Sequence, residues 1–93
     1  MDDLRPVFGQ RLRDLRRQAQ FSQEEVAHRA RLHATYLSDL ERGLQTPTLD
    51  VVNRLATALK VTLAELFGPL DRRFRQRARK VRTDSPARRA RRR

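Results

Sequence analysis

Apolar residues recur at three- and four-residue intervals through the first two thirds of the chain, the spacing that places side chains along one face of an α-helix. The first stripe consists of Leu4, Phe8, Leu12, Leu15 and Ala19. Shorter stripes follow at Val26, Ala27 and Ala30 and at Leu32, Tyr36, Leu37 and Leu40. A fourth stripe consists of Leu49, Val52, Leu55, Ala56 and Leu59. No segment of this region alternates between apolar and polar residues as a strand does, so the spacing predicts an all-α fold.

Local signals mark where these helices begin and end. Ser22 and Glu25 form a capping-box pattern, in which the serine caps the helix and the glutamate reaches back, so a helix is expected to begin at residue 23. Thr62 and Glu65 repeat the pattern and predict a short fifth helix, which Gly68 and the proline after it end. The prediction is therefore a compact domain of five helices.

The second and third helices are joined by only about three residues, 31–33. A connection this short, between helices with small inner residues, forces a steep crossing, as in a helix-turn-helix whose second helix can enter the major groove of DNA. A plain corner between two helices has the same geometry, so the spacing alone leaves both interpretations open. Gly43 is expected to close the third helix in a left-handed conformation.

Charge divides the chain into two parts. Of its 93 residues, 22 are Lys or Arg and 11 are Asp or Glu, a formal net charge of +11. Residues 1–68 are nearly neutral, whereas residues 69–93 hold 12 basic and 2 acidic residues. We therefore expect a folded domain over 1–68 and an Arg-rich extension over 69–93, which could be helical at 70–82 and disordered at 83–93.

The extension ends in the basic cluster Arg88, Arg89, Arg91, Arg92 and Arg93. Such a segment attracts polyanions, nucleic acid first and an anionic membrane surface second; a solubilising appendage is the alternative. It could also be the site where a protein partner binds.

Several function classes find no support in the composition. There is no cysteine, so disulfides, thiolate zinc sites and cysteine nucleophiles are excluded. The two histidines lack metal-ligand spacing, and no glycine-rich phosphate loop or catalytic arrangement is present. No apolar run is long enough to span a membrane. We expect a cytoplasmic, nucleoid-associated protein that is not an enzyme and has no metal, cofactor, small-molecule substrate or membrane contact.

Three short motifs carry a family resemblance. Residues 22–27 are SQEEVA, residues 36–43 are YLSDLERG and residues 47–49 are PTL. In this order and spacing they closely resemble the lambda-repressor-like (Cro/Xre) helix-turn-helix family of bacterial and phage transcriptional regulators, over about residues 5–68. A looser similarity is to the small controller regulators of restriction–modification systems. The resemblance implies that a recognition helix at about 34–42 lies in the major groove.

The resemblance also implies roles for individual residues. Those expected to face the groove and contact base edges are Ala34, Thr35, Ser38 and Asp39. Those expected to contact DNA phosphates are Gln23, His33, Tyr36 and Arg42. Arg16 and Glu41 match a pair that forms a structural salt bridge between the first and third helices. For Asp39, pairing with a neighbouring charge is an interpretation that stays equally open.

Two positions depart from the family pattern. Arg31 stands where members commonly have glycine, so the turn between the second and third helices is expected to be looser or mildly strained. His33 stands where members often have serine or threonine; it is expected to cap the third helix weakly or, when protonated, to contact a phosphate.

The function that these observations predict is sequence-specific binding of double-stranded DNA by a transcriptional regulator, such as a repressor. Because one small module makes few base contacts, a homodimer on a palindromic operator is expected, with half-sites about 34 Å apart. Two alternatives stay open. One is an antitoxin whose segment 69–93 binds a toxin protein. The other is a non-specific architectural protein that binds nucleic acid through its basic extension.

Overall fold

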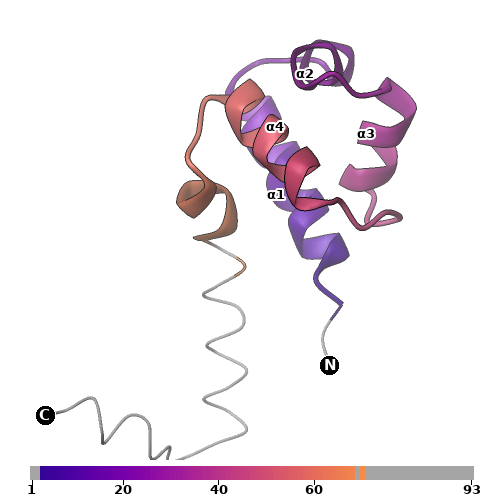
Figure 1. Cartoon of the computed structure of the whole chain (residues 1–93), viewed down its shortest axis with the longest axis vertical. Coiled ribbons are helices and arrows are strands. Elements are labelled where there is room, and N and C mark those ends of the chain that lie inside the picture. The colour runs from indigo at the N-terminus through magenta and orange to yellow at the C-terminus, as the bar shows by residue number, and fades with distance from the viewer. Residues whose placement is uncertain (1–2, 69, 71–93) are drawn as a thin grey trace, which may run out of the picture.

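The fold was analysed in a computed structural model, which describes residues 3–68 and 70 (Figure 1). Four helices follow one another: α1 (Arg5–Gln18), α2 (Gln23–Ala30), α3 (Ala34–Glu41) and α4 (Leu49–Leu59). Residues 63–68 form a further short helix, and residue 70 is helical as well, so the predicted end of the helix at Gly68 and the proline after it is not confirmed. Over the described residues there is no strand, and the predicted all-α fold of five helices is confirmed.

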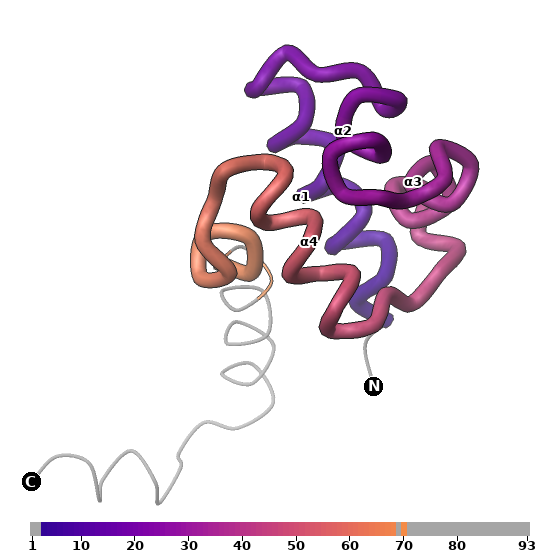
Figure 2. Tube along the Cα trace, turned by 45° about the horizontal axis from the view of Figure 1, so that its top comes forward, coloured from indigo at the N-terminus to yellow at the C-terminus, as the bar shows by residue number. Residues whose placement is uncertain are grey.

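The helices pack around one apolar core. α3 packs against α1, and α2 packs against both α3 and α4. The chain trace in Figure 2 shows α3 at the edge of this arrangement, with α1 and α4 to one side of it. The largest fully buried side chains come from every helix: Leu12, Val26, Leu37, Leu40, Leu55 and Leu66. α3 is thus supported on one side and open on the other.

The segment after α4 completes the core. The rings of Phe8 and Phe67 stack with their centroids 5.9 Å apart, which joins this segment to α1. Leu66 and Leu70 are both buried in the common core, so buried packing extends two residues beyond the expected end of the domain. The remaining residues of the expected extension lie outside the described residues.

The capping boxes form as predicted. The amide of Glu25 donates to Ser22 Oγ (3.0 Å), and the amide of Ser22 donates to Glu25 Oε1 (2.8 Å). Thr62 and Glu65 make the same pair of hydrogen bonds, at 3.0 and 2.8 Å. Each box satisfies two backbone donors at a helix start that would otherwise lack partners.

Side-chain-bearing residues close two of the helices in the left-handed region. Arg31, after α2, has φ 60° and ψ 47°, and Lys60, after α4, has φ 59° and ψ 41°. The left-handed region is unfavourable for residues with a side chain, so the strain expected at Arg31 is present. Gly43, after α3, has φ 78° and needs no compensation for it, as the sequence predicts.

α1 and α3 approach each other closely at Gly9. A Cβ atom at this position would clash with the carbonyl oxygen of Leu40 and would lie 2.5 Å from the carbonyl oxygen of Glu41. The missing side chain therefore allows the end of α3 to rest directly on the backbone of α1.

Three positions of the predicted apolar stripes are exposed. Leu49 has 85% of its surface exposed, Leu4 has 40%, and Ala19 is also exposed. The buried face of α4 runs through Val51, Val52 and Leu55, and residue 49 lies roughly 100° away from its centre around the helix. Leu4 and Ala19 flank α1 rather than lying inside it, so the prediction of a continuous stripe was wrong at these ends.

Candidate nucleic-acid interface

α2 and α3 form a helix-turn-helix. α2 ends at Ala30 and α3 begins at Ala34, so the connection has the expected three residues. Leu37 and Leu40 are completely buried on the inner face of α3, at 0% and 1% exposure. Figure 1 shows α3 at the margin of the domain, beyond α1 and α4. One face of this helix is consequently available to a large partner.

The residues expected to contact bases lie on this outer part of α3. Thr35 is exposed, and Ser38 and Asp39 are half-buried. Ala34 is also half-buried, but it packs against the hydrophobic core, so the structure turns it partly inward rather than wholly toward a groove. Asp39 Oδ1 lies 3.7 Å from Arg42 Nη1, so the internal charge pairing that the sequence left open is present. The pairing reduces the repulsion that an acidic side chain would otherwise exert on phosphates.

The residues expected to contact phosphates surround the same helix. His33 precedes α3 with extended backbone angles but makes no side-chain capping hydrogen bond. Tyr36 packs partly on the core, and Arg42 is exposed just after α3. His33 and Tyr36 line an open hollow of about 300 Å³ together with Arg31 and Leu32.

Gln23, the remaining phosphate candidate, is engaged within the protein. It is the first residue of α2 and half-buried, and its Nε2 donates to Glu41 Oε1 at 3.0 Å. The side-chain oxygen and the free amides of the first turn of α2 are the groups left to meet another molecule.

Glu41 is buried, with 5% of its surface exposed, and lies at the centre of an ionic network. The predicted pair with Arg16 is present and bidentate: Arg16 Nε donates to Oε2 at 2.6 Å and Nη2 to Oε1 at 3.0 Å. Arg13 Nε lies 3.5 Å from Oε1. Side chains from α1 and α2 therefore meet at one carboxylate of α3, which fixes the angles between these helices.

The network also determines the ionisation of this carboxyl group. Burial by itself raises the pKa of Glu41. The hydrogen bonds from Arg16 and Gln23, together with the charges of Arg16 and Arg13, outweigh burial, and the pKa is lowered. The pKa of the Arg16 guanidinium is raised, chiefly by its hydrogen bonds to Glu41. Both groups are thus held in their charged forms.

The arrangement of helices matches known proteins. A family model described as a helix-turn-helix domain matches residues 7–66. The chain belongs to this helix-turn-helix family. An uncharacterized HTH-type transcriptional regulator of Sinorhizobium fredii is 42% identical over 69 residues, which cover 74% of this chain and 90% of that protein. The control protein C.BamHI of Bacillus amyloliquefaciens is 38% identical over 67 residues, covering 71% and 83% of the two chains.

A solved structure agrees with the sequence relatives. The restriction-modification controller protein C.AhdI from Aeromonas hydrophila is 42% identical, with a TM-score of 0.66, and the match covers 67% of this chain and 94% of that one. The predicted resemblance to helix-turn-helix regulators and to controller proteins is confirmed. So is the predicted class of function, a transcriptional regulator that binds DNA in a sequence-specific way.

Two arginines of this helix-turn-helix protein were not predicted from the sequence. Arg13 lies three positions before Arg16 on α1, so the helical spacing could have placed it beside the same carboxylate. Arg54 of α4 donates from Nη1 to the carbonyl oxygens of Ala30 and Arg31, at 3.3 and 3.2 Å. No local pattern links residues so far apart in the sequence.

The remaining predictions concern metal sites, membrane-spanning helices and the basic extension. Within the described part of the chain, no three acidic, histidine or cysteine side chains are grouped so that they could hold a metal ion. None of the described helices is long and apolar enough to cross a membrane. Apart from residue 70, the possible helix at 70–82 lies outside the described residues, and so do the segment 83–93 that was expected to be disordered and the basic cluster within it.

Proposed function

We propose that this protein binds an operator in double-stranded DNA as a homodimer, with α3 of each protomer in a major groove. The observation that carries the proposal is the division of α3 into two faces. Leu37 and Leu40 anchor one face in the core, whereas Thr35 and Ser38 remain accessible on the other. Hydroxyl groups can donate to or accept from base edges, and a threonine methyl can contact a thymine methyl.

The groups around α3 suit contacts with the DNA backbone. The first turn of α2 offers free backbone amides at the positive end of the helix dipole, beside Gln23. Arg42 and His33 lie at the two ends of α3, and both are exposed. In this proposal they fix the register of α3 on the phosphates, while Ala34, Thr35, Ser38 and Asp39 determine the preferred sequence.

The dimeric state follows from the small number of base contacts that one short helix can make. Two protomers would place their recognition helices on half-sites about 34 Å apart, one turn of the duplex. We also propose that the protein acts on DNA in the cytoplasm and carries out no catalytic step. The curated control protein and the solved controller protein described above support regulation as the role.

The test begins with selection of bound duplexes from a random DNA pool by the full-length protein. Thr35→Ala and Ser38→Ala, combined in one variant, should weaken binding to the enriched duplex by about 1–3 kcal/mol per lost base contact. Thr57→Ala is the matched control, because Thr57 is an exposed threonine on α4 whose hydroxyl donates to a backbone carbonyl. A sequence preference that survives in the double variant would refute the proposed role of α3.

A further inference from the structure

The turn between α2 and α3 is held by a side chain from another helix. Arg54 Nη1, on α4, lies 3.3 Å from the carbonyl oxygen of Ala30 and 3.2 Å from that of Arg31. Asp50, one turn earlier on α4, places Oδ2 3.2 Å from Arg54 Nε. Arg54 therefore lies between a carboxylate of its own helix, which it approaches without a hydrogen bond from Nε, and the backbone that leads into α3.

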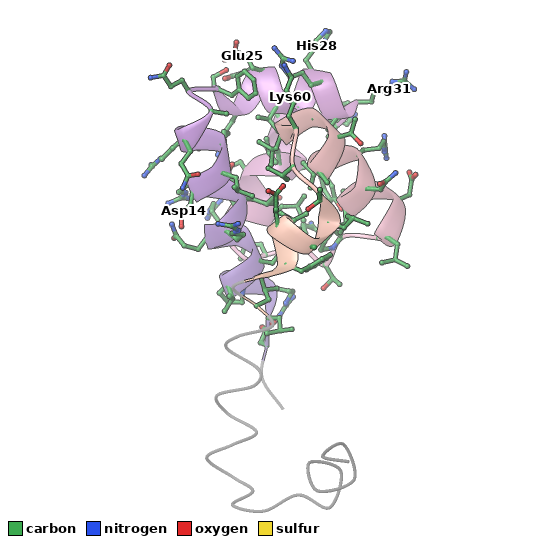
Figure 3. All side chains as sticks on the ribbon, turned by 90° about the vertical axis from the view of Figure 1, so that its left-hand side faces the viewer. Asp14, Glu25, His28, Arg31 and Lys60 are labelled. Carbon is green, nitrogen blue, oxygen red and sulfur yellow. The ribbon has the colours of Figure 1, made fainter. Side chains whose placement is uncertain are left out.

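This contact lies where the backbone adopts an unfavourable left-handed conformation. Arg31 has φ 60° and ψ 47°, a region that residues with a side chain rarely adopt. Figure 3 labels Arg31, whose side chain points outward from the end of α2. The exposed side chain of Arg31 therefore does not stabilise the turn by packing. The left-handed backbone at this residue needs support from the hydrogen bonds around it.

The chemistry of the contact fits such support. The last carbonyl groups of a helix have no partners inside the helix, and a cation near them is favoured by the helix dipole. Arg54 supplies both a donor and a positive charge to these groups. Because only Leu32 and His33 separate Arg31 from α3, a change in the backbone angles at Arg31 would swing the whole of α3.

We infer that Arg54 is a positioning residue for the recognition helix. By holding the carbonyl groups of residues 30 and 31, it fixes the left-handed turn and with it the direction of α3, and so determines sequence preference without touching DNA. Asp50 keeps the guanidinium in place for this role. The inference rests on the proposed function of α3 in contacting bases.

Two other roles for Arg54 make different predictions. A residue that only stabilises the fold would change the melting temperature but not the preference of the folded protein for one duplex over another. A residue that binds a DNA phosphate would weaken binding to all duplexes alike and would reduce the salt dependence of binding by about 0.9 in the slope of log K against log salt.

The experiment measures dissociation constants over a range of salt for the full-length protein, on the enriched duplex and on a shuffled duplex of the same composition. The variants are Arg54→Met, Arg31→Gly and their combination. Lys60→Met is the matched control, because it removes one exposed cation from the end of the same helix. Asp50→Asn is a milder variant that leaves the charge of Arg54 in place, should Arg54→Met fail to fold.

We expect Arg54→Met to lower the ratio of the two affinities about tenfold or more, because it removes the charge-assisted hydrogen bonds that Nη1 shares between the carbonyl groups of residues 30 and 31, with an unchanged salt slope. Asp50→Asn should lower it less, in the same direction, and Lys60→Met should leave it unchanged. Arg31→Gly should restore most of the ratio in the Arg54→Met background, because glycine adopts the left-handed turn without support.

An unchanged ratio for Arg54→Met on an enriched duplex would overturn this inference while leaving the proposed function intact. A reduced salt slope, or no recovery with Arg31→Gly, would also overturn it. If the wild-type protein enriches no duplex, the proposed function and this inference fail together.

Discussion

Gly9 allows a direct test of how α3 is seated on α1. In an exposed helix, replacing glycine with alanine stabilises by about 1 kcal/mol, because alanine loses less backbone entropy on folding. At Gly9 the added methyl group would meet the carbonyl oxygens of Leu40 and Glu41, the latter at 2.5 Å, and the carbonyl carbon of Glu41 at 2.8 Å. We therefore expect Gly9→Ala to destabilise the protein.

The distances give the size of the effect. Carbon–oxygen contacts of this kind normally lie at about 3.3 Å or more, so α1 and α3 would have to separate by roughly 0.8 Å. Backbone occupies both sides of the contact, so no side chain can rotate away, and the cost lies toward the upper end of the about 1–3 kcal/mol typical of overpacking. After subtracting the gain in helix propensity, we expect a net loss of about 2 kcal/mol.

The assay is reversible unfolding by heat and by urea, followed by circular dichroism. A loss of about 2 kcal/mol corresponds to a fall in melting temperature of about 10 °C for a domain of this size. Arg17→Gly, at an exposed position in the last turn of the same helix, measures mainly the propensity effect, with a smaller contribution from the lost cation, and should cost about 1 kcal/mol. A Gly9→Ala variant as stable as the wild type, or more stable, would refute the close seating of α3 on α1.

Three further predictions concern stability. Because the pKa of Glu41 is lowered in the folded state, its ion pair should stabilise the protein above the ordinary value of 4.5 and lose this effect as the pH falls through the lowered pKa. Glu41→Gln should cost about 3 kcal/mol at neutral pH and remove that acid dependence in urea titrations; an unchanged acid dependence would contradict it. Lys60→Gly should stabilise by up to about 1 kcal/mol in thermal unfolding, since Lys60 has φ 59°, and a lower melting temperature would count against strain there. His33→Ser should add a side-chain cap to α3 and raise the free energy of unfolding by about 1 kcal/mol, and no gain would show that this end of α3 is already satisfied.

The features that the sequence predicts best are those that depend on neighbours in the chain. The Ser22–Glu25 and Thr62–Glu65 boxes span three residues each, so their hydrogen bonds follow from the local pattern alone. The left-handed glycine after α3 is predictable for the same reason.

Features that depend on packing between distant elements were missed unless the family resemblance supplied them, as it did for the pair of Arg16 and Glu41. Leu49 satisfies the helical spacing, yet nothing in the described fold covers its position at the first turn of α4. Arg54 contacts Ala30 and Arg31 at the end of α2, which precede it in the sequence by 24 and 23 positions. No helical periodicity predicts a contact over such a separation. The roles of the outer residues of α3 in contacting DNA stay predictions, because these contacts involve a second molecule and not the fold of this chain.

The meeting of α1 and α2 at Glu41 of α3 limits how this helix-turn-helix can be engineered. Residues 23–41, moved alone to another scaffold, would leave behind the guanidinium groups of Arg13 and Arg16, and the graft would carry a buried carboxylate without its cations. A functional graft therefore has to include α1. Thr35 and Ser38 make none of the contacts that hold this network, so under the proposed function exchanging them is the simpler route to a protein with a new operator preference.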